Sequence, residues 1–389
     1  MIVKPADRTA NVQEYYFSQK LAQIDRMRRD GSDVINLGIG SPDQPPSEST
    51  VSALIAEAKK STSHGYQSYS GIPSLRKAFS DWYKKYFYVN LNPDNEILLL
   101  MGSKEGIMHI SMAFVNPGDE VLVPDPGYPT YSSVTNLVGG IVRKYDLSEE
   151  NGWLPDLKSL ELSDLSKVKL MWVNYPNMPT GVKASVDLFE KLVAFSRKHR
   201  ILLVNDNPYS FILNKEYISI FSVEGAKDTA LELNSLSKSH NMAGWRVGMV
   251  GGHSEYIKTI LKVKSNMDSG MFLAMQKAAV EALGNQDSWY GLINSVYSKR
   301  RRIVEDIMKL LKCEYDNSQV GLFVWGRIPE SIPDCESYIE EILLKSLVFI
   351  TPGFIFGKNG ERYIRISLCA TEEKLNEAKS RITTFLNNK

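Results

Sequence analysis

Short apolar runs alternate with helical patterns through the middle of the chain, and this alternation constrains the fold more than any other feature. Six runs of strand length lie between Glu96 and Gly252. Stretches with helical spacing separate several of them, such as Lys104 to Val115 and Ser185 to Lys198. Because parallel strands need crossover connections, this order predicts a largely parallel sheet with helices on both faces. The six runs are Ile97 to Met101, Val121 to Pro124, Val168 to Val173, Ile201 to Asn205, Leu231 to Leu236 and Val247 to Gly251.

The two ends of the chain have other patterns, which predict a second, smaller α+β lobe. Helical spacing runs from Val12 to Arg29, from Phe272 to Lys309 and from Glu372 to Asn387. Short apolar runs in the C-terminal third are Leu322 to Trp325, Leu347 to Ile350 and Tyr363 to Ser367. We predict an N-terminal arm with part of the small domain at 1–45, a large domain at 46–283 and a small C-terminal domain at 284–389. The cleft between the lobes is the expected place for chemistry.

Composition argues against several classes of function. The chain has 46 Lys plus Arg against 45 Asp plus Glu, so its net charge of +1 creates no field for nucleic acid or an anionic membrane. Cys313, Cys335 and Cys369 form no C-x-x-C spacing, which argues against a disulfide framework or a zinc site. No stretch approaches the roughly 18 apolar residues of a membrane span. We expect a cytoplasmic protein without a metal site.

One segment, Ser235 to Gly248, carries the strongest chemical signal. Lys238 lies between hydroxyl side chains and is followed eight residues later by Arg246. A lysine that forms an imine with an aldehyde needs a lowered pKa, which desolvation and neighbouring positive charge supply. Ser235 and Arg246 are suited to a phosphate dianion. The segment therefore combines a candidate reactive lysine with candidate phosphate ligands.

Three other positions place polar groups where they need partners. Asp206 ends a predicted buried strand, where a carboxylate must be paired. The sequence Gly102-Ser103-Lys104 follows a strand and opens a helix, so its backbone N–H groups can hold an anion. Arg365 lies in the strand-like sequence Tyr-Ile-Arg-Ile-Ser, where an arginine on an apolar element requires a bidentate anion.

The segment around Lys238, S-x-S-K followed by G-W-R-x-G, resembles the lysine-to-arginine signature of class I and II, fold-type I aminotransferases. Further blocks in the family's order extend the resemblance from Ile35 to Ser367. It is most similar to the branch of LL-diaminopimelate, alanine and aspartate aminotransferases. The resemblance implies an α/β fold with a mostly parallel seven-stranded sheet, and pyridoxal 5'-phosphate (PLP) as cofactor. It also implies ping-pong transfer of an amino group between an α-amino acid and a 2-oxo acid, with 2-oxoglutarate and glutamate as one pair.

The resemblance also implies roles for particular residues. Lys238 would carry PLP as a Schiff base and act as general base, Asp206 would hold the pyridine nitrogen, and Tyr209 would donate to the ring 3-oxygen. Arg365 would bind the substrate α-carboxylate beside the backbone of Gly40. Further cofactor-binding residues would be Gly102, Ser103, Lys104, Tyr128, Asn177, Ser235, Ser237 and Arg246, together with Tyr66, which would reach the phosphate of the neighbouring subunit in a homodimer.

One block departs from the family pattern. The family usually has P-N-N-P-T-G, whereas this chain has Met178 in place of the second asparagine. A thioether cannot donate a hydrogen bond, so the contact to the ring 3-oxygen and the substrate carboxylate is missing or is supplied by Asn177 after a local shift. We also predict a cis peptide bond at Met178-Pro179, as is common in the family.

Three alternative functions can be weighed on the sequence. A PLP-dependent carbon–sulfur β-lyase would share the fold and would release pyruvate and ammonia without an oxo-acid acceptor. A PLP-sensing regulator would need a DNA-binding domain, and the sequence presents none before the aminotransferase-like region. A nicotinamide dehydrogenase is rejected, because Gly38-Ile39-Gly40 is followed by Asp43 where the third glycine of G-x-G-x-x-G would stand.

Overall fold

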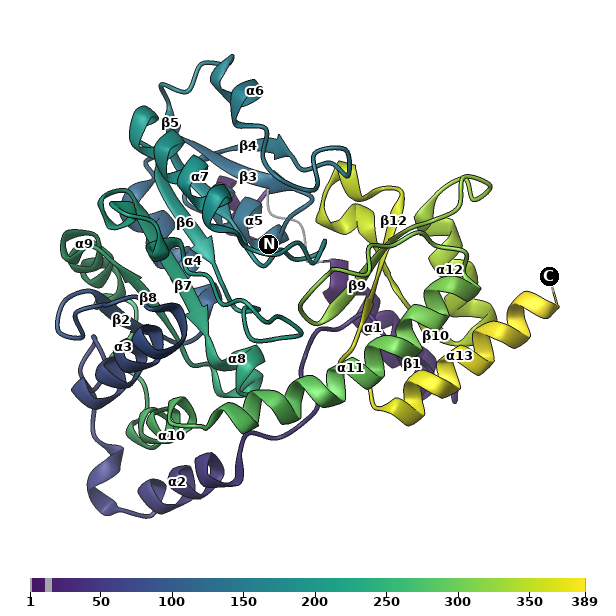
Figure 1. Ribbon diagram of the computed structural model, residues 1–389, viewed down its shortest axis with the longest axis horizontal. Coiled ribbons are helices and arrows are strands. Elements are labelled where there is room, and N and C mark those ends of the chain that lie inside the picture. The colour runs from purple at the N-terminus through teal and green to yellow at the C-terminus, as the bar shows by residue number, and fades with distance from the viewer. Residues whose placement is uncertain (1, 11–15, 389) are drawn as a thin grey trace.

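A seven-stranded sheet forms the centre of the large lobe in the computed structural model, which describes residues 2–10 and 16–388 (Figure 1). The strand order is β2-β8-β7-β6-β5-β3-β4. Strand β8 alone runs in the opposite direction to the other six, so the predicted largely parallel sheet is confirmed. The strands are β2 (Ile97–Leu100), β3 (Glu120–Asp125), β4 (Ile141–Asp146), β5 (Val168–Val173), β6 (Leu202–Asp206), β7 (Ala230–Ser235) and β8 (Gly248–Gly252).

Helices cover both faces of this sheet, because successive strand residues point to opposite sides. Along β5, Leu170 and Trp172 join one core, whereas Met171 and Val173 join the core on the other face. The first core contains side chains of α4 (Ser103–Phe114), α5 (Pro129–Leu137) and α9 (Ser254–Lys264). The second contains α7 (Val186–His199), and a third core joins β2 and β8 to α3 (Pro73–Phe87). Short helices are α6 (Leu157–Glu161) and α8 (Leu236–Ser239).

The small lobe combines short strands with helices α1, α12 and α13, in line with the predicted α+β lobe. Its antiparallel sheet has the order β11-β12-β9, and β1 pairs in parallel with β10. Ile24 and Leu37 from the N-terminal region belong to the same core as the C-terminal elements. The elements are α1 (Tyr16–Arg29), β1 (Ile35–Asn36), β9 (Phe323–Arg327), α12 (Cys335–Ser346), β10 (Val348–Phe349), β11 (Thr351–Pro352), β12 (Tyr363–Ser367) and α13 (Glu372–Asn387). The first residues of the predicted N-terminal helix, 12–15, lie outside the described residues.

A long helix joins the two lobes. The amphipathic stretch from Phe272 to Lys309 forms two helices, α10 (Leu273–Leu283) and α11 (Asp287–Leu310). Helix α10 packs against α2 (Glu48–Ala58). Helix α11 runs from the large lobe into the small lobe (Figure 1). Its Tyr290 packs in the large-lobe core with α3, and its Val304 in the small-lobe core, so both cores share one element.

The backbone confirms one further prediction. The peptide bond Met178-Pro179 is cis, as are Asp125-Pro126 and Tyr175-Pro176, which the sequence did not single out.

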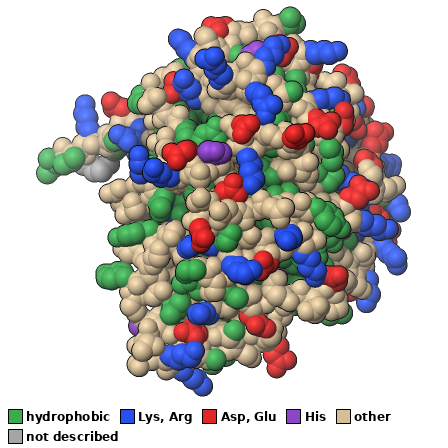
Figure 2. Space-filling model, turned by 60° about the vertical axis from the view of Figure 1, so that its left-hand side comes forward, with side chains coloured by type: hydrophobic (Ala, Val, Ile, Leu, Met, Phe, Trp, Pro, Cys, Tyr) green, Lys and Arg blue, Asp and Glu red, His purple; other side chains and the backbone are tan. Residues whose placement is uncertain are grey.

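Charges of both signs are interspersed over the face of the molecule in Figure 2, in line with a net charge of +1. Within residues 2–10 and 16–388, no helix is both long enough and apolar enough to cross a membrane.

Candidate active site

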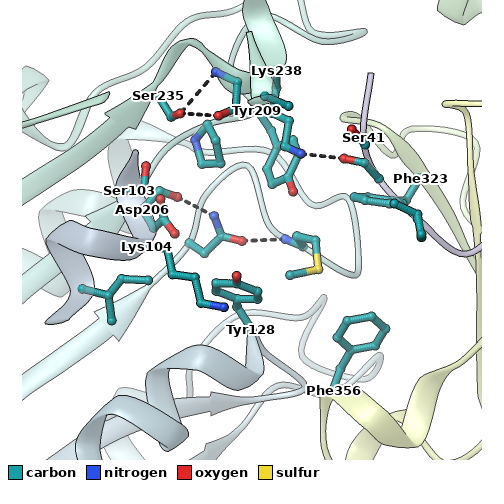
Figure 3. A pocket seen from close by; sticks show the side chains of 18 of the residues that line it. Ser41, Ser103, Lys104, Tyr128, Asp206, Tyr209, Ser235, Lys238, Phe323 and Phe356 are labelled. Carbon is teal, nitrogen blue, oxygen red and sulfur yellow. Dashed lines mark hydrogen bonds between the residues drawn. The ribbon is translucent and has the colours of Figure 1, made fainter. Parts of the chain in front are cut away.

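One edge of the large sheet brings the ends of several strands together. Strands β2, β7, β6, β5 and β3 are parallel to one another, so their C-terminal ends lie at the same edge. A cavity of about 540 Å³ opens there. Its lining includes residues of both lobes, which places it in the cleft where chemistry was expected (Figure 3). The predicted site residues that line it are Gly40, Ser103, Lys104, Tyr128, Asp206, Tyr209, Ser235, Ser237, Lys238, Arg246 and Arg365.

Lys238 lies in α8, directly after β7, and its side chain is partly buried in the cavity wall. Its Nζ donates a hydrogen bond to the Gly40 carbonyl oxygen at 2.5 Å. Burial lowers the pKa of Lys238, and the positive charges of Arg365 and Arg246 act in the same direction. A lysine with a lowered pKa has a larger neutral fraction near pH 7, and the neutral amine is the form that attacks an aldehyde or accepts a proton.

Asp206 ends β6 and points into the cavity (Figure 3). Its Oδ2 accepts a hydrogen bond from the Tyr131 hydroxyl at 3.0 Å, whereas its buried Oδ1 has no hydrogen-bond partner among the described residues. Burial raises the pKa of Asp206 to about 6. A buried carboxylate with an unsatisfied oxygen requires a cationic or N–H partner, and the protonated ring nitrogen of PLP has that chemistry.

A candidate phosphate-binding site, here called the phosphate cup, lies at the start of α4 and consists of Gly102, Ser103, Ser235, Ser237 and Arg246. Gly102 has a φ of +83°, and a Cβ added there would lie 2.2 Å from Arg246 Nη2, so only glycine lets the guanidinium approach this backbone. The Ser103 hydroxyl is buried without a hydrogen-bond partner among the described residues. Ser235 Oγ donates to Ser237 Oγ at 2.8 Å in the opposite wall. The helix N-terminus, hydroxyls and guanidinium together fit a phosphate dianion, so these residues and Asp206 both suit PLP.

Arg365 lies on β12 and enters the cavity from the small lobe. It is buried, and its guanidinium carbon lies 3.8 Å from the ring centre of Phe323 and 4.6 Å from that of Phe356. Its Nη2 donates to the Gly38 carbonyl oxygen at 2.8 Å. The two rings hold the guanidinium plane in place, as suits an arginine that receives a carboxylate.

The block that departs from the family pattern does not bring Asn177 into the cavity. Asn177 Oδ1 accepts a hydrogen bond from the Thr180 hydroxyl at 2.7 Å, and its Nδ2 donates to the Asn174 carbonyl oxygen at 3.1 Å. The side chains that line the cavity here are Asn174 and Met178. Asn174 Oδ1 accepts from the Met178 backbone N–H at 2.8 Å, and Asn174 Nδ2 donates to the Asp206 carbonyl oxygen. The local shift that would have let Asn177 replace the family contact is therefore not observed.

Tyr66 also lies outside the cavity of its own chain. Its side chain is 94 % exposed. Three other exposed apolar residues occur in the same loop and in the segment after α9, namely Tyr69, Met267 and Phe272. The two loops pack against each other, since a Cβ at Gly270 would lie 2.7 Å from the carbonyl oxygens of Gln67 and Ser68.

A cluster of potential metal ligands lies behind the phosphate cup. Glu105, His109 and Asp268 offer ligand atoms that all lie within 4.8 Å of one another. Lys264 Nζ lies 2.6 Å from Asp268 Oδ1 and 2.7 Å from Oδ2. The ammonium group of Lys264 thus already supplies a cation to this cluster, and we assign no metal to it.

Comparison with known proteins agrees with this geometry. The family model described as aminotransferase class I and II matches residues 32–382. A protein named LL-diaminopimelate aminotransferase from Oleidesulfovibrio alaskensis is 41 % identical over 387 residues, covering 98 % of each chain. One of the same name from Aquifex aeolicus is 39 % identical, covering 97 % of this chain and 98 % of its own.

Solved structures show the same fold. The apo structure of BacF from Bacillus subtilis superposes with a TM-score of 0.94 at 33 % identity, covering 99 % of this chain and 98 % of its own. A mutant of Thermus thermophilus aspartate aminotransferase superposes with a TM-score of 0.91 at 25 % identity, covering 98 % and 100 %.

Fold and site together define a PLP-dependent enzyme of fold type I. More specifically, the chain belongs to the class I and II aminotransferase family, and its activity is that of an aminotransferase.

Proposed function

We propose that this aminotransferase moves an amino group between LL-diaminopimelate and 2-oxoglutarate, with the site residues in the roles given below. The observation that carries these roles is the convergence of Lys238, Asp206 and Arg365 on one cavity. The amino acid is inferred from the printed names of the relatives at about 40 % identity.

Each proposed role follows from the position of the side chain. PLP, when bound, withdraws electrons from the substrate α-carbon and makes its hydrogen acidic. Lys238 Nζ removes that proton and would deliver it to the cofactor side instead of the α-carbon, since its lowered pKa favours the neutral amine. Asp206 stabilises positive charge at the pyridine nitrogen, and Arg365 fixes the α-carboxylate. Ser103, Ser235, Ser237 and Arg246 hold the phosphate, and the ring of Tyr128 stacks on the cofactor.

We further propose a cytoplasmic homodimer with shared active sites. The 94 % exposure of Tyr66 and the exposed apolar side chains of the adjoining loop support an interface there. The three cysteines are free and buried, which suits a reducing compartment. The common core of N-terminal and C-terminal residues supports placing 1–45 and 284–389 together, beside a large domain at 46–283 against which the first turns of α11 pack.

Absorption spectra test the proposed roles and substrates. A band above about 400 nm with PLP should shift to about 330 nm on addition of LL-diaminopimelate and return with 2-oxoglutarate. Lys238→Ala should not form the same band. If LL-diaminopimelate leaves the band unchanged while another amino acid shifts it, the proposed donor is wrong. If a cysteine-like amino acid, added without an oxo acid, gives pyruvate and ammonia, the β-lyase function replaces transamination.

Mixing two inactive variants tests whether Tyr66 acts across the interface. Hybrids of Tyr66→Ala and Lys238→Ala subunits contain one site with both residues intact if Tyr66 serves the neighbouring subunit. Activity should then rise above that of either variant alone. If Tyr66 serves its own chain, every site in the hybrid lacks one of the two residues, and no activity is regained.

A further inference from the structure

Met178 lies in the cavity wall beside Arg365, and the proposed function assigns no role to this residue. Its side chain is buried and lines the cavity. Its Sδ accepts a hydrogen bond from Arg365 Nη1 at 3.2 Å. The sulfur therefore contacts the group that the proposed function assigns to the substrate carboxylate.

The backbone around Met178 is fixed by several hydrogen bonds. Its own N–H donates to Asn174 Oδ1, while the Asn177 N–H donates to the Val182 carbonyl oxygen at 2.8 Å and the Gly181 N–H to the Asn177 carbonyl oxygen at 2.9 Å. The loop therefore fixes the backbone position from which the thioether reaches Arg365, and burial of the side chain limits the rotamers that it can adopt.

The guanidinium group of Arg365 contacts two aromatic rings and two hydrogen-bond acceptors. Phe323 and Phe356 cover the guanidinium at 3.8 and 4.6 Å. In the plane, the Gly38 carbonyl oxygen accepts from Nη2 at 2.8 Å, and Met178 Sδ accepts from Nη1. The two rings oppose tilting of the guanidinium group, and these two acceptors oppose its rotation within its own plane. Sulfur is a weak acceptor, so it fixes the direction of Nη1 without neutralising the positive charge of the guanidinium.

We propose that Met178 is a positioning residue for Arg365, whose sulfur acts as a hydrogen-bond acceptor that orients Nη1 for the substrate carboxylate. This inference rests on the proposed role of Arg365 as the carboxylate ligand. It differs from a packing role, in which only the volume of the side chain would matter.

Two substitutions of similar size separate the acceptor role from the packing role. Met178→Leu keeps an apolar side chain of similar volume and removes the acceptor. Met178→Gln keeps the length and replaces sulfur with an amide oxygen, which is a stronger acceptor. If the acceptor matters, Leu impairs the site and Gln restores it. If only packing matters, Leu resembles the wild type and the polar Gln is the worse substitution.

The measurements are steady-state kinetics and the binding of glutarate to the holoenzyme by calorimetry. Glutarate has the carboxylates of 2-oxoglutarate but no oxo group, so its affinity reports the carboxylate site without turnover. For Met178→Leu we expect the KM of both substrates and the Kd of glutarate to rise about fivefold, and kcat to change less than KM. Met178→Gln should lie within about twofold of the wild type. Met171→Leu, a buried methionine of β5, serves as the matched control and should leave glutarate binding unchanged.

Three results would overturn the proposed role of Met178 or that of Arg365. A Met178→Leu protein that binds glutarate as tightly as the wild type, or a Met178→Gln protein that binds it more weakly than Met178→Leu, would remove the positioning role. Arg365→Met tests the underlying assignment separately. If Arg365→Met leaves glutarate binding unchanged, the proposed role of Arg365 fails, whatever the Met178 variants show.

Discussion

The buried carboxylate of Asp206 predicts that the apoenzyme becomes more stable when this residue is replaced by asparagine. Burial raises its pKa from 3.8 to about 6, a shift of about two pKa units. Each unit corresponds to about 1.4 kcal/mol, so the ionised side chain costs the folded apoenzyme about 3 kcal/mol at pH 8. Because the folded state binds its proton more tightly than the unfolded state, stability falls as pH rises from about 4 to about 6 and is then constant.

The pH dependence of this effect makes the prediction specific. Asp206→Asn carries no charge at this position, so its advantage in the apoenzyme should be about 3 kcal/mol at pH 8 and about half of that at pH 5. Urea unfolding of both apoproteins at the two pH values measures the difference, and other titrating groups cancel because both proteins contain them. PLP should reverse the order, since only the carboxylate pairs with the ring nitrogen. An Asp206→Asn apoprotein that is no more stable than the wild type, or whose advantage does not change with pH, would refute the reasoning.

Two further predictions concern the phosphate cup and Tyr131, the hydrogen-bond partner of Asp206. Gly102→Ala places a Cβ 2.2 Å from Arg246 Nη2 at a φ of +83°, so PLP affinity measured by fluorescence titration should fall at least about tenfold. Gly244→Ala, where a Cβ meets no atom within 4 Å, is the control and should bind PLP normally. Tyr131→Phe removes a hydrogen bond that lowers the pKa of Asp206, so the pKa should rise above about 6 and apoenzyme stability should keep falling to a higher pH than in the wild type. An unchanged pH profile of unfolding would contradict this.

Much of the fold could be predicted because its strands are buried on both faces. The run from Val168 to Val173 matches β5 residue for residue, and the other predicted strands of the large sheet differ from the observed ones by one residue at one end or at both. The sequence missed β4, an edge strand that contains Arg143 and Lys144 and has an exposed Ile141 at its start. Because an edge strand is partly exposed to solvent, its sequence does not need a continuous run of apolar residues.

The cavity was predictable only in part. Gly40, Asp206, Lys238 and Arg365 stand in recognisable motifs, and all four line the cavity. Other lining residues carry no such signal, because tertiary packing alone brings them there. They are Tyr131, Asn174, Phe323 and Phe356, together with Ser18 and Leu21 of α1. Tyr131 follows Tyr128 by three residues at the start of α5, a helical spacing that would have justified considering both.

Helix α11 contributes side chains to the cores of both lobes, with Tyr290 near one end and Ile307 near the other. A helix cannot lose its middle turns without disturbing the hydrogen bonds of the turns on either side. Loosening of the small lobe would therefore expose apolar surface at the α3 side of the large lobe as well. The two lobes should thus melt in a single transition, and a fragment cut between them would leave each part with half of a shared helix.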